Sequence, residues 1–155
     1  MKRYYRLIFI VLLIGFSFLL SACGLTGGNQ TANLQVKSAH YLNPDINGRA
    51  SPVVVTVYQL KTPFAFQQAS YDALASNSGK ILGSDLLDMD TFEIRPSTNK
   101  ELSVTLTPNT EYLGIIAAYR NINQAVSWHK AVKVSPGSSI NIDLESQSMI
   151  VSKSK

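Results

Sequence analysis

The first 23 residues limit the possible folds of this chain most, because they mark where a leader segment ends and the folding part begins. Basic residues at positions 2, 3 and 6 precede an almost unbroken apolar run over residues 7–20, and two small residues, Ser21 and Ala22, stand before Cys23. This order is that of a secretory signal peptide. The run of 14 residues is shorter than the roughly 20 that a membrane-spanning helix needs. We therefore predict that residues 1–22 are a signal peptide and that the remaining 133 of the 155 residues are exported.

The lone cysteine stands where the leader ends. Cys23 is the only cysteine, so the exported chain has no disulfide within itself even in an oxidising compartment. The sequence Leu20-Ser21-Ala22-Cys23 resembles the lipobox of bacterial lipoproteins, in which the thiol takes a diacylglycerol and the amine freed by cleavage takes a third acyl chain. Two chains already give stable attachment. Because Gly24 rather than Asp follows, the resemblance implies the outer membrane, facing the periplasm. The alternative is an ordinary signal peptide with a chance cysteine after it.

The segment after the cysteine and the charge balance limit the domain and its partners. Residues 24–32 are polar and Gly-rich without a charge, which is typical of a flexible linker. We predict a lipidated N-terminus and tether over residues 23–32 and one periplasmic domain over residues 33–155. Three of the 14 basic residues lie in the leader, which leaves 11 against 10 acidic residues. This charge gives no reason to expect a nucleic-acid partner.

Alternating apolar and polar residues predict strands through most of the mature chain. The first runs from Asn33 to about Leu42. Residues 53–60 are β-branched on both faces, which favours a central strand buried on both sides. Further strands are predicted over residues 92–95, 101–106, 112–119, 127–134 and 139–144, and residues 146–151 extend the last strand or add a short one. The segments 127–134 and 139–144 are expected to pair as a hairpin across residues 135–138.

Residues 63–78 have helical spacing instead. Pro63 suits a first helical turn, and Ser78 with Gly79 is expected to stop the helix. A second short helical piece is expected over residues 84–90. About seven strands with one helical excursion predict an all-β fold, a two-sheet β-sandwich with a short helical insertion.

No pattern in the sequence is typical of catalysis or of a metal centre. His40 and His129 have no Cys, Asp or Glu at metal-ligand spacing. Asp85, Asp88 and Asp90 cluster, but they lack the Gly and terminal Glu of a calcium loop. We expect Asp85 to cap a short helix and the other two to be solvated. Motifs for a nucleophile or a phosphate loop are missing, so we predict no enzyme activity, no metal and no cofactor.

Two features remain that suit binding. The rings of Trp128 and of three tyrosines, Tyr58, Tyr112 and Tyr119, could line a ligand cleft, but on the strands of a small sandwich such rings are more often core. The loop before residue 53 sets one apolar side chain among polar ones and an arginine, which is common in protein contacts; a plain solvated connector is the alternative. The candidate loop residues are Asn43, Pro44, Asp45, Ile46, Asn47, Gly48, Arg49, Ala50 and Ser51.

Several segments together resemble a known family. Residues 42–61, 66–74, 82–96 and 112–121 are similar to the outer-membrane lipoprotein of the bacterial type VI secretion system, the TssJ family, and the resemblance spans roughly residues 34–145. It implies a transthyretin-like β-sandwich with an added helical part. It also implies a partner, the periplasmic C-terminal region of the large inner-membrane anchor protein TssM. In the family the loop between the first two strands makes this contact, which here corresponds to residues 43–51.

Two other functions stay open at this stage. A transthyretin-like hydrolase would need His and Arg side chains converging on a cleft and a characteristic tail, which residues 150–155 do not offer. A lipoprotein that binds a glycan or another small ligand would need exposed rings. Solvent exposure of Trp128 and Tyr119 therefore separates a glycan-binding protein from a docking protein.

Overall fold

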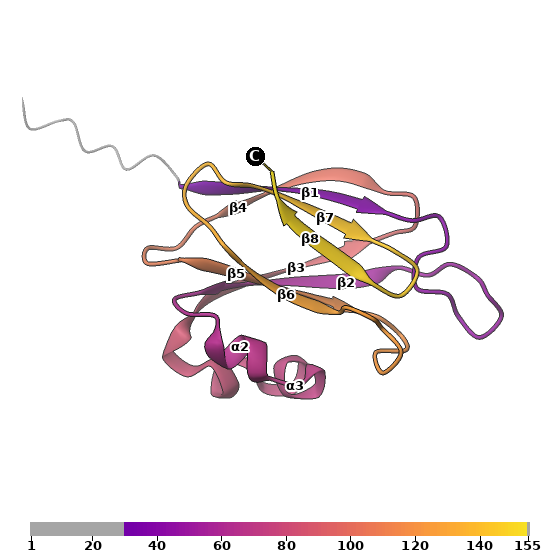
Figure 1. The fold of residues 1–155 in the computed structure, drawn as a ribbon, viewed down its shortest axis with the longest axis horizontal. Helices are drawn as coiled ribbons and strands as arrows, with labels where there is room; N and C mark the ends of the chain where they lie inside the picture. Colours follow the sequence, from indigo (N-terminus) through magenta and orange to yellow (C-terminus); the bar gives the residue numbers. More distant parts are fainter. Residues whose placement is uncertain (1–29, 155) are drawn as a thin grey trace, which may run out of the picture.

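The structure, a computed structural model, describes residues 30–154 and consists of two four-stranded sheets packed face to face (Figure 1). The predicted signal peptide, Cys23 and residues 24–29 of the predicted tether lie outside the described residues. One sheet has the strand order β4-β1-β7-β8, and the other has the order β3-β2-β5-β6. The predicted all-β sandwich is therefore confirmed.

The helical segment lies between the second and third strands of the chain. The elements are β1 (Thr31–Ser38), β2 (Val53–Leu60), α2 (Phe64–Gln68), α3 (Tyr71–Leu82), a short 3-10 helix η2 (Gly83–Asp85), β3 (Leu86–Ile94), β4 (Asn99–Thr105), β5 (Tyr112–Ala118), β6 (His129–Lys133), β7 (Ser139–Leu144) and β8 (Met149–Lys153).

Strand alternation forms the core between the sheets. In β1, Ala32, Leu34 and Val36 are buried, and the residues between them are half-buried or exposed. The strand begins two residues before the expected Asn33 and ends at Ser38 rather than near Leu42. The chain then turns, but the side chain of Leu42 still packs in the core.

Helices α2 and α3 cover part of the outer face of the β3-β2-β5-β6 sheet (Figure 1). Phe66 of α2 and Leu74 of α3 form a second apolar cluster with Tyr58 and Ile116 of the sheet. The strand β2 is therefore buried on both faces only in its second half, and Val54 near its start is 41% exposed. No helix within residues 30–154 is long and apolar enough to cross a bilayer.

The helical segment runs further than its sequence suggests. Ser78 and Gly79 do not stop it, and α3 continues to Leu82 with a local break at Asn77 (φ −156°, ψ 52°). It ends at Gly83, whose φ of 52° lies in the left-handed region that glycine adopts readily.

Residues 84–90, expected to be helical, mostly belong to β3, which pairs with β2 along its length. Asp88 and Asp90 interrupt the apolar alternation in the first half of this edge strand. The sequence therefore does not indicate a strand there. Pairing with β2 supplies the backbone hydrogen bonds that fix it as a strand.

The expected hairpin of residues 127–134 with residues 139–144 is wrong. The strand β6 pairs with β5, whereas β7 lies in the other sheet, parallel to β1 and antiparallel to β8. The turn between β6 and β7 bonds to the start of β1 instead: Gly137 N donates to Thr31 O at 2.8 Å, and Asn33 N donates to Ser138 O at 2.9 Å. The chain therefore crosses from one sheet to the other at this turn.

Strand directions divide the connections between the two ends of the sandwich. Four loops lie at one end, on the right of Figure 1, and they comprise residues 39–52, 95–98, 119–128 and 145–148. The start of β1 lies at the opposite end, together with the turn between β6 and β7 and the C-terminal end of β8. The described domain thus begins at one end and gathers its longest loops at the other.

Candidate functional site

The base of the β1–β2 loop is held by Asn43, which is only 6% exposed and adopts a left-handed φ of 46°. Its Nδ2 donates to Pro52 O at 2.8 Å, and its Oδ1 accepts from Arg120 N at 2.7 Å. Its backbone N donates to Ser146 O at 3.0 Å. The side chain and the backbone N–H of Asn43 therefore join the β1–β2 loop to the β5–β6 and β7–β8 loops.

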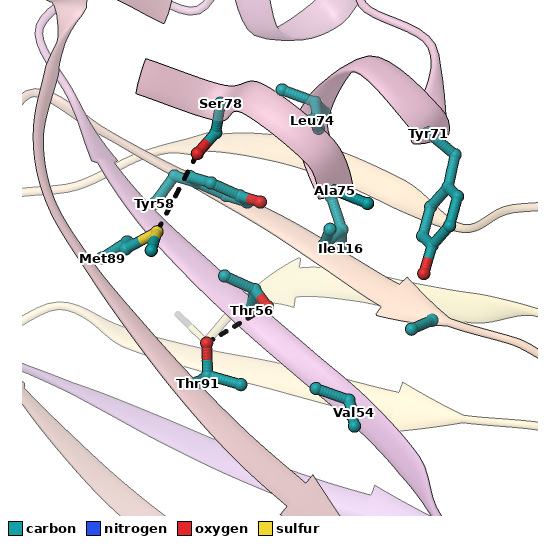
Figure 2. Close-up of a pocket in the computed structure, with 11 residues that line it drawn as sticks. Val54, Thr56, Tyr58, Tyr71, Leu74, Ala75, Ser78, Met89, Thr91 and Ile116 are labelled. Atoms are coloured by element: carbon teal, nitrogen blue, oxygen red, sulfur yellow. Dashed lines mark hydrogen bonds between the residues drawn. The ribbon is translucent and has the colours of Figure 1, made fainter.

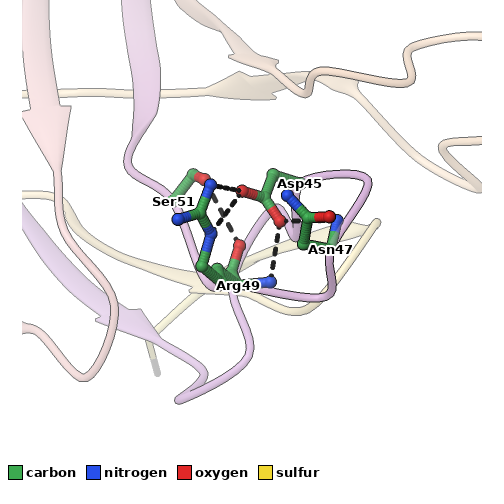
Figure 3. Close-up of polar contacts among 4 residues, drawn as sticks. All are labelled: Asp45, Asn47, Arg49 and Ser51. Carbon is green, nitrogen blue, oxygen red and sulfur yellow. Dashed lines mark hydrogen bonds and ion pairs between the residues drawn. The ribbon is translucent and has the colours of Figure 1, made fainter.

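The tip of the loop is closed by Asp45 and Arg49 (Figure 3). Asp45 Oδ1 accepts from the backbone N of Asn47 and of Arg49, both at 2.9 Å, and Oδ2 lies 2.8 Å from both Nε and Nη2 of Arg49. Gly48, at a φ of 75°, makes the turn and donates its N–H to Asp45 O at 2.9 Å. Hydrogen bonding by the Arg49 amide, opposed by desolvation and aided by the Arg49 side chain, lowers the pKa of Asp45.

This closed turn presents Ile46 to solvent. The side chain of Ile46 is 96% exposed, and the neighbouring Asn47, Gly48, Arg49 and Ala50 are exposed too. Pro44, Asp45 and Ser51 are half-buried, and Asn43 is buried. The candidate residues therefore divide into a structural base and an accessible tip, a division that their sequence does not reveal.

The aromatic candidates belong to the packed interior, as expected. Tyr58 and Tyr119 are 3% and 4% exposed, and Tyr112 and Trp128 are half-buried against the two apolar clusters. Tyr119 Oη donates to Ser148 O at 2.5 Å, and burial raises its pKa. These rings form no exposed platform of the kind that binds glycans.

The titratable candidates lie apart from one another. His129 stacks on Trp128 with ring centroids 3.9 Å apart, and desolvation lowers its pKa. His40 is exposed, with Nδ1 3.2 Å from Ser97 Oγ. Asp85 lies in η2 and accepts from Thr62 Oγ1 at 3.0 Å, so it does not act as the helix cap expected from the sequence. Among residues 30–154, no group of three or more His, Cys, Asp or Glu side chains is arranged to hold a metal ion.

A groove of about 390 Å³ lies between α3 and the uncovered part of the outer sheet face (Figure 2). Its polar contacts are Thr56 Oγ1 to Thr91 Oγ1 at 3.3 Å and Ser78 Oγ to Met89 Sδ at 4.0 Å. No Asp, Glu, His, Lys or Arg side chain lines it, and its polar groups are the hydroxyls of Ser, Thr and Tyr residues and one thioether. The position of α3 on the sheet creates this groove, and the sequence gives no signal for it.

The sequence interpretation missed one feature of the loop end. Val126, on the β5–β6 loop, is 88% exposed. The available signal is a branched apolar residue after Asn123, Gln124 and Ala125, but Ile122 in the same loop gives the same signal and is partly buried against the core. It resembles the signal that pointed to Ile46.

Comparison with known proteins decides the family. A family profile described as type VI secretion lipoprotein (VasD, EvfM, TssJ) matches residues 30–148. The chain belongs to the type VI secretion lipoprotein family. Among curated proteins no significant match was found.

Solved structures agree with this family. The chain is 32% identical to the type VI secretion lipoprotein TssJ1 from Pseudomonas aeruginosa, with a TM-score of 0.76, and the match covers 83% of this chain and 98% of that one. Lip from Serratia marcescens, a membrane-bound component of the type VI secretion system, is 20% identical with a TM-score of 0.73 over 79% of this chain and 97% of that one. A chain in a structure described as the TssM C-terminal domain (869–1107) from EAEC is 20% identical with a TM-score of 0.69, again over 79% and 97%. The matches at 20% identity support the fold of this type VI secretion lipoprotein.

Proposed function

We propose that this lipoprotein attaches the type VI secretion membrane complex to the outer membrane. Acyl chains on Cys23 hold the N-terminal end of the domain at the membrane, and the β1–β2 loop at the opposite end binds the periplasmic C-terminal region of TssM. The domain catalyses no reaction and requires no cofactor or metal. A chain of the same fold in the structure described as the TssM C-terminal domain supports this choice of partner.

The observation that carries the proposal is the exposed tip of an ordered loop. Ile46 is 96% exposed, although the loop around it is closed by the Asp45–Arg49 pair and fixed at its base by Asn43. An apolar side chain held in place by its loop loses less conformational freedom on binding than a mobile one, so more of its burial energy appears as affinity. A solvated connector has no need of such internal bonding.

The test removes the tip and leaves the base. Replacing residues 44–50 by a short Gly-Ser linker keeps Asn43 and its bonds, so the purified processed lipoprotein should unfold at nearly the same temperature. It should no longer retain the TssM periplasmic region in a pull-down. Retention equal to that of the wild-type protein would show that the loop is not the docking element.

A glycan or small-ligand function is not favoured. Tyr58 and Tyr119 are buried, and Trp128 packs between Tyr71 and His129. The groove beside α3 offers neutral hydroxyls and one thioether but no exposed ring stack. The rings that the sequence suggested for sugar recognition therefore offer no open stacking face.

A further inference from the structure

We propose that Val126 is a second apolar anchor of the docking surface, and that the β1–β2 and β5–β6 loops bind TssM together. This inference rests on the proposed function and extends it from one loop to two. It assigns a binding role to a loop that the sequence interpretation did not select.

The first argument is exposure. Ile46 and Val126, at 96% and 88%, are the most exposed large apolar side chains of the described residues, followed by Phe64 at 73% and Tyr41 at 65%. Single exposed apolar residues are ordinary on a protein surface. Here, however, the two extreme cases both lie on loops at the end of the sandwich away from the start of β1.

The second argument is that the two loops share one support. Arg120 N, at the start of the β5–β6 loop, donates to Asn43 Oδ1 at 2.7 Å. Both loops also bond to the β7–β8 connection, since Asn43 N donates to Ser146 O at 3.0 Å and Val126 N donates to Gln147 O at 3.1 Å. Their relative position is therefore set before a partner arrives, which lowers the entropy cost of using both at once.

The third argument is size. A stable protein interface covers about 800 Å² on each partner and involves roughly 20–30 residues per side. The whole connection of residues 39–52 is shorter than that, and Leu42 and Asn43 within it are buried. A partner that covers Ile46 must therefore extend to a neighbouring surface. Of the two loops bonded to Asn43, the β5–β6 loop carries another exposed apolar side chain.

The chemistry of the surface defines what TssM must offer. Asp45 and Arg49 pair with each other, so the tip of the β1–β2 loop presents little net charge. We expect two apolar depressions on TssM, one for each branched side chain, and an affinity that changes little with salt because few unpaired charges are involved.

The experiment compares three aspartate variants of the full processed lipoprotein in detergent: Ile46→Asp, Val126→Asp and Phe64→Asp. Each places a charge at a site that is already exposed, so unfolding temperatures should stay near that of the wild-type protein. Phe64 is the matched control, because it is 73% exposed but lies beyond the opposite end of β2. Affinity for the purified TssM periplasmic region is measured by titration at two salt concentrations.

We expect Ile46→Asp and Val126→Asp each to weaken binding about tenfold or more, as loss of a buried interface anchor does, and Phe64→Asp to bind like the wild-type protein. Wild-type affinity in Val126→Asp with weakened binding in Ile46→Asp would overturn the second anchor and leave the proposed function standing. No binding by the wild-type protein, or wild-type affinity in Ile46→Asp, would overturn the proposed function itself.

Discussion

At the tip of the β1–β2 loop, one carboxylate accepts two backbone N–H groups and pairs with a guanidinium. Charge-assisted hydrogen bonds of this kind are stronger than neutral ones, yet the guanidinium side of the ion pair is solvated, with the side chain of Arg49 76% exposed and that of Asp45 14% exposed. The contribution of the ion pair to the free energy of unfolding is therefore small. Its effect is on the shape of the loop, because it fixes the turn that carries Ile46.

The variants Asp45→Ala and Asp45→Asn separate the two kinds of contact. Alanine removes every contact of the side chain, whereas asparagine retains an oxygen for the amides of Asn47 and Arg49 but loses the ion pair. We expect the free energy of unfolding to fall by about 0.5–2 kcal/mol in Asp45→Ala, because two backbone N–H groups lose their acceptor, and by less in Asp45→Asn. Hydrogen exchange at these two amides should quicken more in Asp45→Ala, and TssM affinity should fall about threefold to tenfold because the loop must then be ordered on binding. Equal exchange rates in both variants and the wild-type protein would show that Asp45 does not hold this turn.

His129 should make stability depend on pH. Desolvation lowers its pKa in the folded protein below the ordinary 6.5. The unfolded chain therefore binds a proton more readily, so this residue's contribution is fully present above about pH 6.5 and decreases as the pH falls below that value. Urea unfolding at pH 7.5 and 5.5 measures the change. In His129→Phe, which retains a ring against Trp128, the loss of stability between these two pH values should be smaller than in the wild-type protein.

Sequence reasoning selected the β1–β2 loop, which we propose as the docking element, but could not divide its residues by role. Turn-forming residues and one branched side chain mark the segment. The burial of Asn43, however, depends on Arg120, which is 77 positions away, and on Ser146. A local sequence pattern does not reveal such distant partners. The sequence alone therefore does not distinguish the buried Asn43 from the exposed residues beside it.

Among the elements, α2 packs the ring of Phe66 directly against Gly114 of β5. A Cβ placed there would lie 2.8 Å from Phe66 Cε2 and 2.9 Å from Leu60 Cδ1. Phe66 and Leu60 are fully buried, so neither side chain can move aside freely. The glycine thus permits the helix to cover the outer face of the sheet.

Gly114→Ala should lower the free energy of unfolding by about 1–3 kcal/mol, since added bulk in a packed core forces its neighbours apart. The matched control is Gly79→Ala in α3, where nothing lies within 4 Å of the added Cβ. That change should be neutral or stabilise by up to about 1 kcal/mol, because alanine is the better helix former. Chemical denaturation of both variants checks the pair, and equal stability would show that the close approach is unimportant.

At the level of single elements, strands with a regular hydrophobic pattern were predictable from the sequence. Strands whose position depends on pairing with another strand were not. Alternation identified β1 and β4, and a continuous apolar run identified β5, because one face of the first two and both faces of β5 are buried. Alternation found only the end of β3, at residues 92–95, because acidic residues interrupt the first half of this edge strand. The turn before β7 has the composition of a hairpin turn. The chain nevertheless crosses to the other sheet there, because β7 pairs with the edge of β1 that faces away from β4.

At the scale of the whole molecule, membrane attachment and partner binding are assigned to opposite ends and should be separable. Replacing Cys23 with serine removes the thiol that would be acylated. We expect the variant to leave the outer-membrane fraction and to abolish type VI secretion, while the affinity of the purified domain for TssM stays unchanged. Fractionation and titration measure the two properties independently. Firm retention of Cys23→Ser in the outer membrane would contradict lipid anchoring through this residue.

The central position of β1 has a mechanical consequence. Tension between a fixed N-terminus and a partner gripping the β1–β2 loop would run along this one strand, whose eight residues span about 26 Å at roughly 3.3 Å per residue. The strand is flanked on both sides, with seven residue pairs to β4 and six to β7. Extraction would have to shear both ladders at the same moment instead of unzipping them bond by bond. The fold thereby places an interior strand, paired on both sides, in the line of force.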